Sequence, residues 1–174
     1  MSKLNKKFYT QDALKVAPQL IGKLLVRKLE NGEIIKYRIT EVESYCGEED
    51  TACHARVGKT NRTAIMYEQG GLAYIYLCYG MHHMINVVTG EKDKPQAVLI
   101  RGVEGLNGPG KLTKAMNIGK ELNGTSFVTS DKIWIEDDGY IAKYKTDKRV
   151  GIDYATEKYR NIEWRYIMIK KDVK

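Results

Sequence analysis

Side chains suited to binding and attacking a flat polar ligand occur in four segments of the chain. The segments are TEVESY (40–45), DTACHA (50–55), AYIYLCYGMHHMINVV (73–88) and VLIRGVE (98–104). Together they supply a glutamate beside a tyrosine, a loop histidine, three hairpin tyrosines, an asparagine and an arginine. Aromatic rings stack on flat ligands, and carboxylate and imidazole groups transfer protons. The combination predicts an aromatic-walled polar pocket, although each residue alone is more typical of packing or of solvated surface.

Two carboxylates take an unusual place on the extended run EIIKYRITEVESY (33–45). Side chains alternate along a strand, so the odd positions from Ile35 to Ile39 form one face. Continued alternation predicts that Glu41, Glu43 and Tyr45 lie on that same core-facing row. Charged groups are seldom placed on an apolar face unless they are paired or functional.

Nucleotide and metal sites fit the sequence less well. The run from Gly105 to Lys111 has the spacing of a phosphate-binding loop, but Leu112 stands where Ser or Thr would hold Mg²⁺, and Pro109 lacks a backbone N–H. Two interpretations of this run stay open. Its lysine contacts a nucleic acid phosphate, or the run is a plain turn that begins a helix. The adjacent His82 and His83 point to opposite faces of a strand, and the cysteines lack ligand spacing. We therefore expect no metal and no cofactor.

The elements that must position these residues alternate between extended and helical patterns. A helix is predicted to begin after Thr10, which would cap its N-terminus, and to extend to about Gly22. Pro18 either divides this helix or leaves it continuous. Two hairpins are expected, one turning at Asn31-Gly32 and one near Gly80-Met81. Residues 46–71 are predicted to form a long loop with a short helix near 63–67. A further helix is expected after the Gly-Pro-Gly run, and further strands are expected at 96–104, 133–138 and 165–170. The chain (1–174) is predicted to be one α+β domain with a curved, mainly antiparallel sheet, flanking helices and a protruding hairpin.

Charge and composition favour an anionic partner. The 174 residues carry 29 Lys+Arg against 22 Asp+Glu, and 12 of the 16 aromatic residues are tyrosines. The net charge is +5 in residues 1–30, −3 in 31–140 and +5 in 141–174, which is typical of nucleic acid binding or of an ordinary solvated face. Three cysteines, no secretion signal and no long apolar run predict a cytoplasmic (nucleoid-associated) or nuclear protein with no membrane role. A monomer is expected.

The same residues carry a family resemblance. The ordered series TEVESY, D-x-x-x-H, R-x-x-x-M-Y, Y-x-Y-x-x-YGMH-x-x-x-NVV, VLIR, GPGKL and RVGI resembles the alkyladenine (3-methyladenine) DNA glycosylases, which are distinct from the helix-hairpin-helix glycosylases. The similarity extends from about residue 11 to residue 171. It implies an enzyme that flips an alkylated, or also a deaminated, purine out of double-stranded DNA and hydrolyses its N-glycosidic bond.

The resemblance also implies roles for individual residues. It assigns water activation to Glu43, assisted by Arg101. The implied base pocket consists of Tyr45, His54, Tyr76, Asn86 and Leu99. The residues implied to intercalate at the flipped nucleotide are Tyr79 and Met81, and those implied to contact the DNA backbone are Arg62, Lys111 and Arg149.

The implied chemistry needs residues of these types. A purine alkylated at N3 or N7 is cationic, so it leaves readily without an added acid and stacks strongly on electron-rich rings. Glu41 is then supporting rather than catalytic, and the absence of a lysine beside Glu43 predicts hydrolysis without a lyase step. The alternatives are a non-catalytic nucleic-acid-binding module of the same fold and an NTPase, which fails at Leu112.

Overall fold

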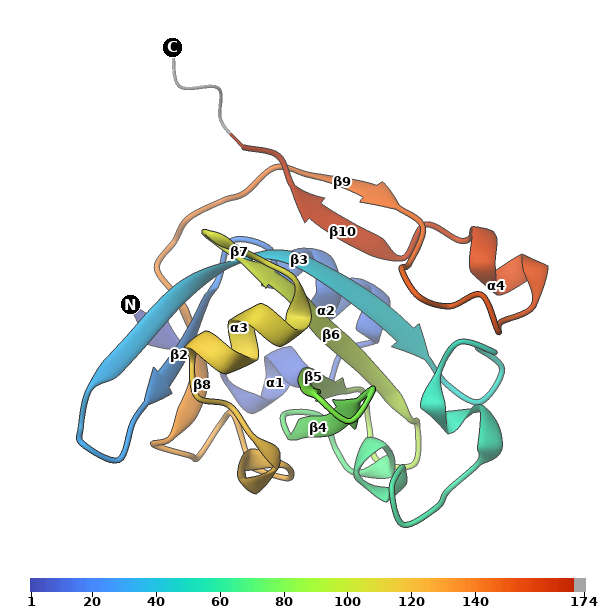
Figure 1. Ribbon diagram of the computed structural model, residues 1–174, viewed down its shortest axis with the longest axis horizontal. Coiled ribbons are helices and arrows are strands. Elements are labelled where there is room, and N and C mark those ends of the chain that lie inside the picture. The colour runs from blue at the N-terminus through green and yellow to red at the C-terminus, as the bar shows by residue number, and fades with distance from the viewer. Residues whose placement is uncertain (171–174) are drawn as a thin grey trace.

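A ten-stranded sheet forms the centre of the protein in a computed structural model that describes residues 1–170 (Figure 1). The strands are β1 (Ser2–Lys3), β2 (Leu24–Lys28), β3 (Ile34–Cys46), β4 (Ala73–Cys78), β5 (His82–Thr89), β6 (Gln96–Val103), β7 (Leu106–Asn107), β8 (Ile133–Asp137), β9 (Tyr144–Asp147) and β10 (Arg165–Met168). Their main order is β1-β8-β2-β3-β6-β5-β4, with β10 joining β3 to β9 and β7 on β6. The paired strands are antiparallel, which confirms the predicted α+β fold with a curved antiparallel sheet.

Short helices cover parts of this sheet. They are α1 (Lys6–Tyr9), α2 (Ala13–Leu20), α3 (Pro109–Ala115) and α4 (Glu157–Asn161), with 3₁₀ helices η1 (His54–Val57), η2 (Ala64–Tyr67) and η3 (Lys120–Leu122). The prediction of Thr10 as the cap of α2 is wrong, because the Asp12 carboxylate accepts the Leu14 N–H at 2.8 Å and caps the helix. Pro18 lies inside α2 without ending it, since buried Val16 and Leu20 hold both sides of the proline on the core.

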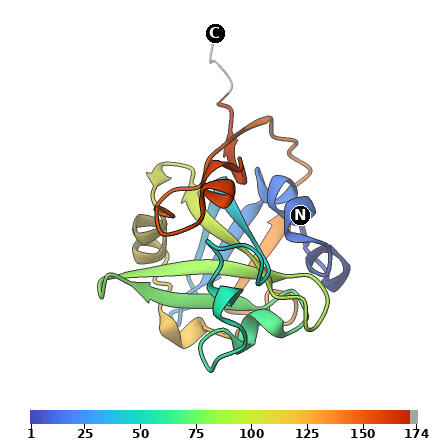
Figure 2. The same cartoon turned by 90° about the vertical axis from the view of Figure 1, so that its right-hand side faces the viewer.

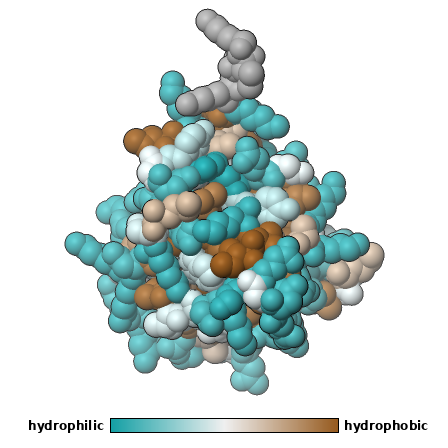
Figure 3. Space-filling model, turned by 90° about the vertical axis from the view of Figure 1, so that its left-hand side faces the viewer, coloured by the Kyte–Doolittle hydropathy of each residue, from teal (hydrophilic) through white to brown (hydrophobic). Residues whose placement is uncertain are grey.

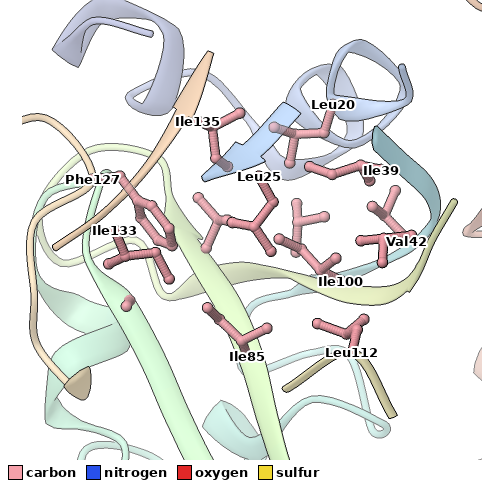
Figure 4. Packing of buried hydrophobic residues seen from close by; sticks show 14 of the residues in the cluster. Leu20, Leu25, Ile39, Val42, Ile85, Ile100, Leu112, Phe127, Ile133 and Ile135 are labelled. Carbon is pink, nitrogen blue, oxygen red and sulfur yellow. The ribbon is translucent and has the colours of Figure 1, made fainter. Parts of the chain in front are cut away.

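The main core lies between the sheet and these helices. It joins buried apolar side chains from strands across the sheet, from α2 and from α3 (Figure 4). Members that are labelled in Figure 4 include Leu20, Leu25, Ile39, Val42, Ile85, Ile100, Leu112, Phe127, Ile133 and Ile135. This cluster fixes the middle of β3 and β6, from which the polar residues of the predicted pocket project.

Strand β3 changes the face that it presents to this core. Ile39 and Val42 are both fully buried in the main cluster, although they are three residues apart. The pairing with β6 shifts on both sides of Glu41, which lies opposite Gly102. A Cβ atom at Gly102 would lie 3.2 Å from Thr40 Oγ1 and 3.3 Å from Glu41 Cβ, so any larger residue would crowd β3 at this close approach.

The irregularity corrects the predicted row of side chains. After it, even positions face the main core, as the Ser44 hydroxyl bond to the Ala13 carbonyl shows. Glu43 and Tyr45 therefore point to the opposite face from Ile39, and the prediction of one continuous row is wrong. Period-two alternation fails at the shift in register because one strand residue is left without a partner there.

The hairpin formed by β4 and β5 protrudes from the body of the protein (Figure 2). Its turn is Tyr79, Gly80 and Met81, and the Met81 N–H bonds to the Cys78 carbonyl at 3.2 Å. Tyr79 and Gly80 have positive φ values of 52° and 67°, which suit the twist of a tight hairpin. A tyrosine seldom adopts this conformation, and such an outlier is typical of a functional position.

The face at the end of the β2–β3 hairpin is mainly hydrophilic, with several separate apolar spots, the largest near the middle of the view (Figure 3). Over residues 1–170, none of the helices has the length and apolar character that crossing a membrane requires.

Candidate active site

A pocket of about 500 Å³ opens beside the β4–β5 hairpin and collects most of the predicted site residues. Its walls come from β3, β4, β5, β6, the loop that contains η1, and the segment around residue 150. The predicted residues that line it are Tyr45, His54, Arg62, Tyr76, Tyr79, Asn86, Leu99 and Arg101. These residues are distant in the sequence, so the sheet brings them together.

Glu43 lies beneath the pocket and is completely buried. Its Oε1 accepts the Tyr45 hydroxyl at 3.0 Å and lies 3.5 Å from Arg101 Nη1, and its Oε2 accepts the Val150 N–H at 2.6 Å. Burial raises the pKa of Glu43, while Arg101, the Val150 N–H, Tyr45 and Arg149 each oppose that rise. The carboxylate is thus a buried base whose ionised form depends on a few donors.

A network of charged side chains holds Arg101 next to this carboxylate. Its Nε donates to Glu41 Oε1 at 3.2 Å, and the same oxygen accepts Arg165 Nη1 at 3.2 Å. Arg165 also pairs with Asp147 at 2.8 Å. Glu41 therefore orients two arginines, which fits its predicted supporting role.

Aromatic rings form the walls of the pocket. The His54 and Tyr76 rings lie 4.6 Å apart at 63°, and Tyr74 lies 5.4 Å from Tyr76. The Arg62 guanidinium sits 5.2 Å from the Tyr76 ring centre at the exposed rim. The pocket therefore offers several electron-rich faces, and Arg62 already uses one of them as a cation–π partner.

Tyr74 contributes to the site although the sequence analysis left it unassigned. Its hydroxyl shares a 2.8 Å hydrogen bond with His54 Nδ1, and its carbonyl accepts the Asn86 side-chain amide at 3.1 Å. The Y-x-Y spacing was the available signal, because it places Tyr74 and Tyr76 on one face of a strand. Tyr74 thus fixes two predicted pocket residues at once.

The histidine is held in its neutral form. Burial, reinforced by Arg62 and Arg56, lowers the pKa of His54 to about 4. At neutral pH it is therefore an uncharged ring with one nitrogen engaged by Tyr74.

The floor of the pocket is formed by central strands. Asn86 on β5 lies opposite Leu99 on β6, and both are almost fully buried. Their neighbours in the same sheet restrict the side-chain positions, so the depth of the pocket is set by strand packing rather than by a flexible loop.

A segment near the end of the chain closes the pocket. Val150, Gly151, Ile152 and Tyr154 line it, and the Tyr154 hydroxyl donates to the Ala52 carbonyl at 2.7 Å. Only the RVGI motif pointed to this segment in the sequence, and nothing there distinguished Tyr154 from the other tyrosines.

The three predicted DNA-backbone residues lie in different surroundings. Arg62 and Lys111 are exposed, at the pocket rim and on α3. Arg149 is only 5% exposed and pairs through both terminal nitrogens with the equally buried Asp50. A phosphate has no access to this guanidinium in the structure, so the expected role of Arg149 does not fit its position.

The hairpin tip and the Gly-Pro-Gly turn flank the pocket. Tyr79 and Met81 are 89% and 74% exposed, as insertion into a partner requires. Gly108 caps α3, and a Cβ at Gly110 would lie 2.8 Å from the His82 ring, so these glycines serve the helix start and its packing. Within residues 1–170, no three His, Cys, Asp or Glu side chains are grouped as metal ligands.

Comparison with known proteins gives a consistent set of relatives. A family model described as methylpurine-DNA glycosylase (MPG) matches residues 7–107 and 104–172. Relatives provisionally named 3-methyladenine DNA glycosylase occur in Natranaerobius thermophilus, at 45% identity, and in Borreliella burgdorferi, at 43%. Another with the same provisional name, from Clostridium perfringens, is 40% identical. Each alignment covers 94% of both chains.

The neutral state of His54 makes stability depend on pH. The unfolded chain binds a proton at an ordinary histidine pKa of 6.5, whereas the folded protein resists protonation until about pH 4. Stability is therefore lost as pH falls through this window, by up to roughly 3 kcal/mol. We expect the free energy of unfolding in urea to drop about 2 kcal/mol more in wild type than in His54→Asn between pH 7 and pH 4.5. Equal drops in the two proteins would contradict a buried neutral His54.

Proposed function

The chain belongs to the methylpurine-DNA glycosylase family, and we propose that it flips an alkylated purine out of duplex DNA and releases it with a water activated by Glu43. It is a hydrolytic DNA glycosylase. The observation that carries the proposed mechanism is one buried carboxylate, held 3.5 Å from Arg101, at the base of an aromatic pocket.

Binding of the base follows from the aromatic walls. In the proposal the base lies between Tyr45 on one side and Tyr76 with His54 on the other. An alkylated purine is cationic, so it gains cation–π attraction from these rings that a normal purine lacks. A neutral His54 avoids charge repulsion with that cation.

Selection among purines would depend on the floor of the pocket. Asn86 and Leu99 are fixed by strand pairing, so a ligand with an additional exocyclic group in their direction meets rigid neighbours. We propose that Asn86 excludes the 2-amino group of guanine. Deaminated purines are neutral and lose the cation–π contribution, so their excision would depend on this fit alone.

Hydrolysis of the glycosidic bond requires a base and a stabilising anion. A carboxylate offers about four acceptor positions, and donors from Tyr45, Val150 and Arg101 approach three of those of Glu43. In the proposal the attacking water takes the remaining position. The same negative charge faces the positive charge that develops on the sugar. Because a cationic purine leaves unaided, no second carboxylate is needed and Glu41 stays a support for Arg101.

Extrusion of the nucleotide needs a side chain that takes its place. Tyr79 and Met81 extend from a protruding hairpin, and flipped nucleotides leave a gap that costs a few kcal/mol unless it is filled. Minor-groove proteins commonly insert such wedges. We propose that exposed Arg62 and Lys111 hold the distorted phosphate backbone of double-stranded DNA bound by a monomer.

A non-catalytic binding module of the same fold is disfavoured. Burial of Glu43 disfavours the ionised form of its carboxylate. A protein that only binds DNA phosphates gains nothing from a buried carboxylate, which is costly to keep.

Removal of the Glu43 charge tests the mechanism. Glu43→Gln should lower the single-turnover rate of 3-methyladenine release from a duplex oligonucleotide at least about 100-fold, because general base catalysis contributes 10²–10⁴-fold. Binding of lesion DNA should persist. Glu136→Gln, on the distant strand β8, is the control and should excise at the wild-type rate. Excision by Glu43→Gln at the wild-type rate would refute the assignment.

Truncation of the hairpin wedge tests flipping. Tyr79→Ser should weaken binding to lesion duplexes about tenfold or more while leaving binding of the free base nearly unchanged, because only the duplex has a gap to fill. Tyr144→Ser, another exposed tyrosine on β9, is the control. Equal losses for duplex and free base would argue against a wedge.

A further inference from the structure

The buried Arg149–Asp50 pair is the most strongly connected charged group that the proposed mechanism does not use. Arg149 Nη1 and Nη2 bond to the two Asp50 oxygens at 2.6 and 2.9 Å, and Nη1 also donates to the Ser44 carbonyl at 2.9 Å. Asp50 in turn accepts the N–H groups of Cys46 and Ala52 at 3.0 Å. The pair thereby joins the end of β3, the following loop and the segment near residue 150.

The planar guanidinium also has two aromatic neighbours. Its centre lies 4.8 Å from the Tyr45 ring and 5.0 Å from the Trp164 ring. Tyr45 is a wall of the pocket and donates to Glu43. A lysine at this position would keep the charge but lose the two-point bond to Asp50 and the flat stacking surface.

The next residue in the chain provides a second route to the active site. Val150 follows Arg149 directly, and its N–H donates to Glu43 Oε2 at 2.6 Å. Two of the donors to Glu43, the Tyr45 hydroxyl and the Val150 N–H, are therefore attached to groups that Arg149 holds in place. Arg101 reaches Glu43 independently, through β6 and Glu41.

We propose that Arg149, locked by Asp50, is a positioning residue for excision that holds Tyr45 and Val150 so that their donors meet the Glu43 carboxylate. It contacts neither base nor phosphate. The proposal rests on the proposed function of Glu43 as the base that activates water.

The test is the variant Arg149→Lys in single-turnover excision of 3-methyladenine at saturating enzyme across pH. We expect the maximal rate at neutral pH to fall about ten- to hundredfold, since small misplacements of catalytic groups have effects of this size. Affinity for lesion DNA should change less than about threefold, because Arg149 contacts no DNA in this scheme.

The pH profile distinguishes positioning from simple loss of stability. The charged and titratable groups around Glu43 are Arg101 and Glu41, Tyr45 and Tyr76, Arg165, and Arg149 itself. The Tyr45 hydroxyl and the Val150 N–H both favour the ionised carboxylate, so their displacement should move the rising limb of the profile to higher pH. A lower melting temperature with an unchanged saturated rate and an unchanged rising limb would overturn the proposal.

The chain offers a matched control. Arg38 pairs with Asp138 at 3.2 and 2.8 Å and stacks 4.4 Å from the Tyr140 ring, so it repeats the chemistry away from the pocket. Arg38→Lys should leave the saturated rate and the rising limb as in wild type.

Two further variants keep the outcome decisive. If Arg149→Lys does not fold, Trp164→Leu removes one stacking face and leaves the ion pair, and a smaller rate loss with the same pH shift is expected. An unaffected Trp164→Leu would then overturn the proposal. Glu43→Gln is measured in parallel: full activity there refutes the role of Glu43, whereas an inactive Glu43→Gln with a fully active Arg149→Lys refutes only the role of Arg149.

Discussion

The change of face in the middle of β3 is the constraint on which the site depends. A regular strand would place Ile39, Glu41 and Glu43 on one side and bury both carboxylates in the apolar cluster. The paired irregularity of β3 and β6 instead keeps Ile39, Val42 and Ile100 in the core while Glu43 turns to the pocket. Gly102 permits the close approach that this requires. The Glu43 carboxylate is thus supported by a strand paired on both sides, with β6 and β10, rather than by a loop.

Burial of Glu43 then determines much of its surroundings. An isolated carboxylate without water is costly, so donors must be supplied by neighbouring elements. They come from β3 itself, from β6 through Arg101, and from the segment that begins at Arg149. Arg101 and Val150 are 49 residues apart in the sequence. The full set of donors to Glu43 therefore forms only when the C-terminal part of the chain packs against the sheet.

Local features of the fold could be predicted from the sequence because their causes are local. The hairpin turn predicted near Gly80-Met81 and the helix predicted at the Gly-Pro-Gly run follow from residues within a few positions, as the structure confirms. The row of carboxylates on β3 could not be assigned correctly, because the shift in register arises in the pairing with β6, which the local sequence of β3 does not show. The partner of Arg149 is Asp50, 99 residues earlier, and no local pattern in the sequence indicated this pairing, so the resemblance alone implied a phosphate contact for this arginine. In the sequence Tyr74 is typical of a packing residue, because its hydrogen bond to His54 joins two distant segments.

The hairpin carries both parts of the proposed flipping step. Tyr76 lines the pocket and Tyr79 occupies the turn three residues later, a separation of about 10 Å in an extended strand. Strand pairing of Tyr76 with Met84 fixes the base of the turn, and positive φ at Tyr79 fixes the direction in which it leaves. Insertion of Tyr79 into a duplex would therefore bring Tyr76 to a set distance from the vacated position. In the proposed function the wedge and one wall belong to the same hairpin, so insertion of Tyr79 and presentation of Tyr76 to the displaced base would occur together.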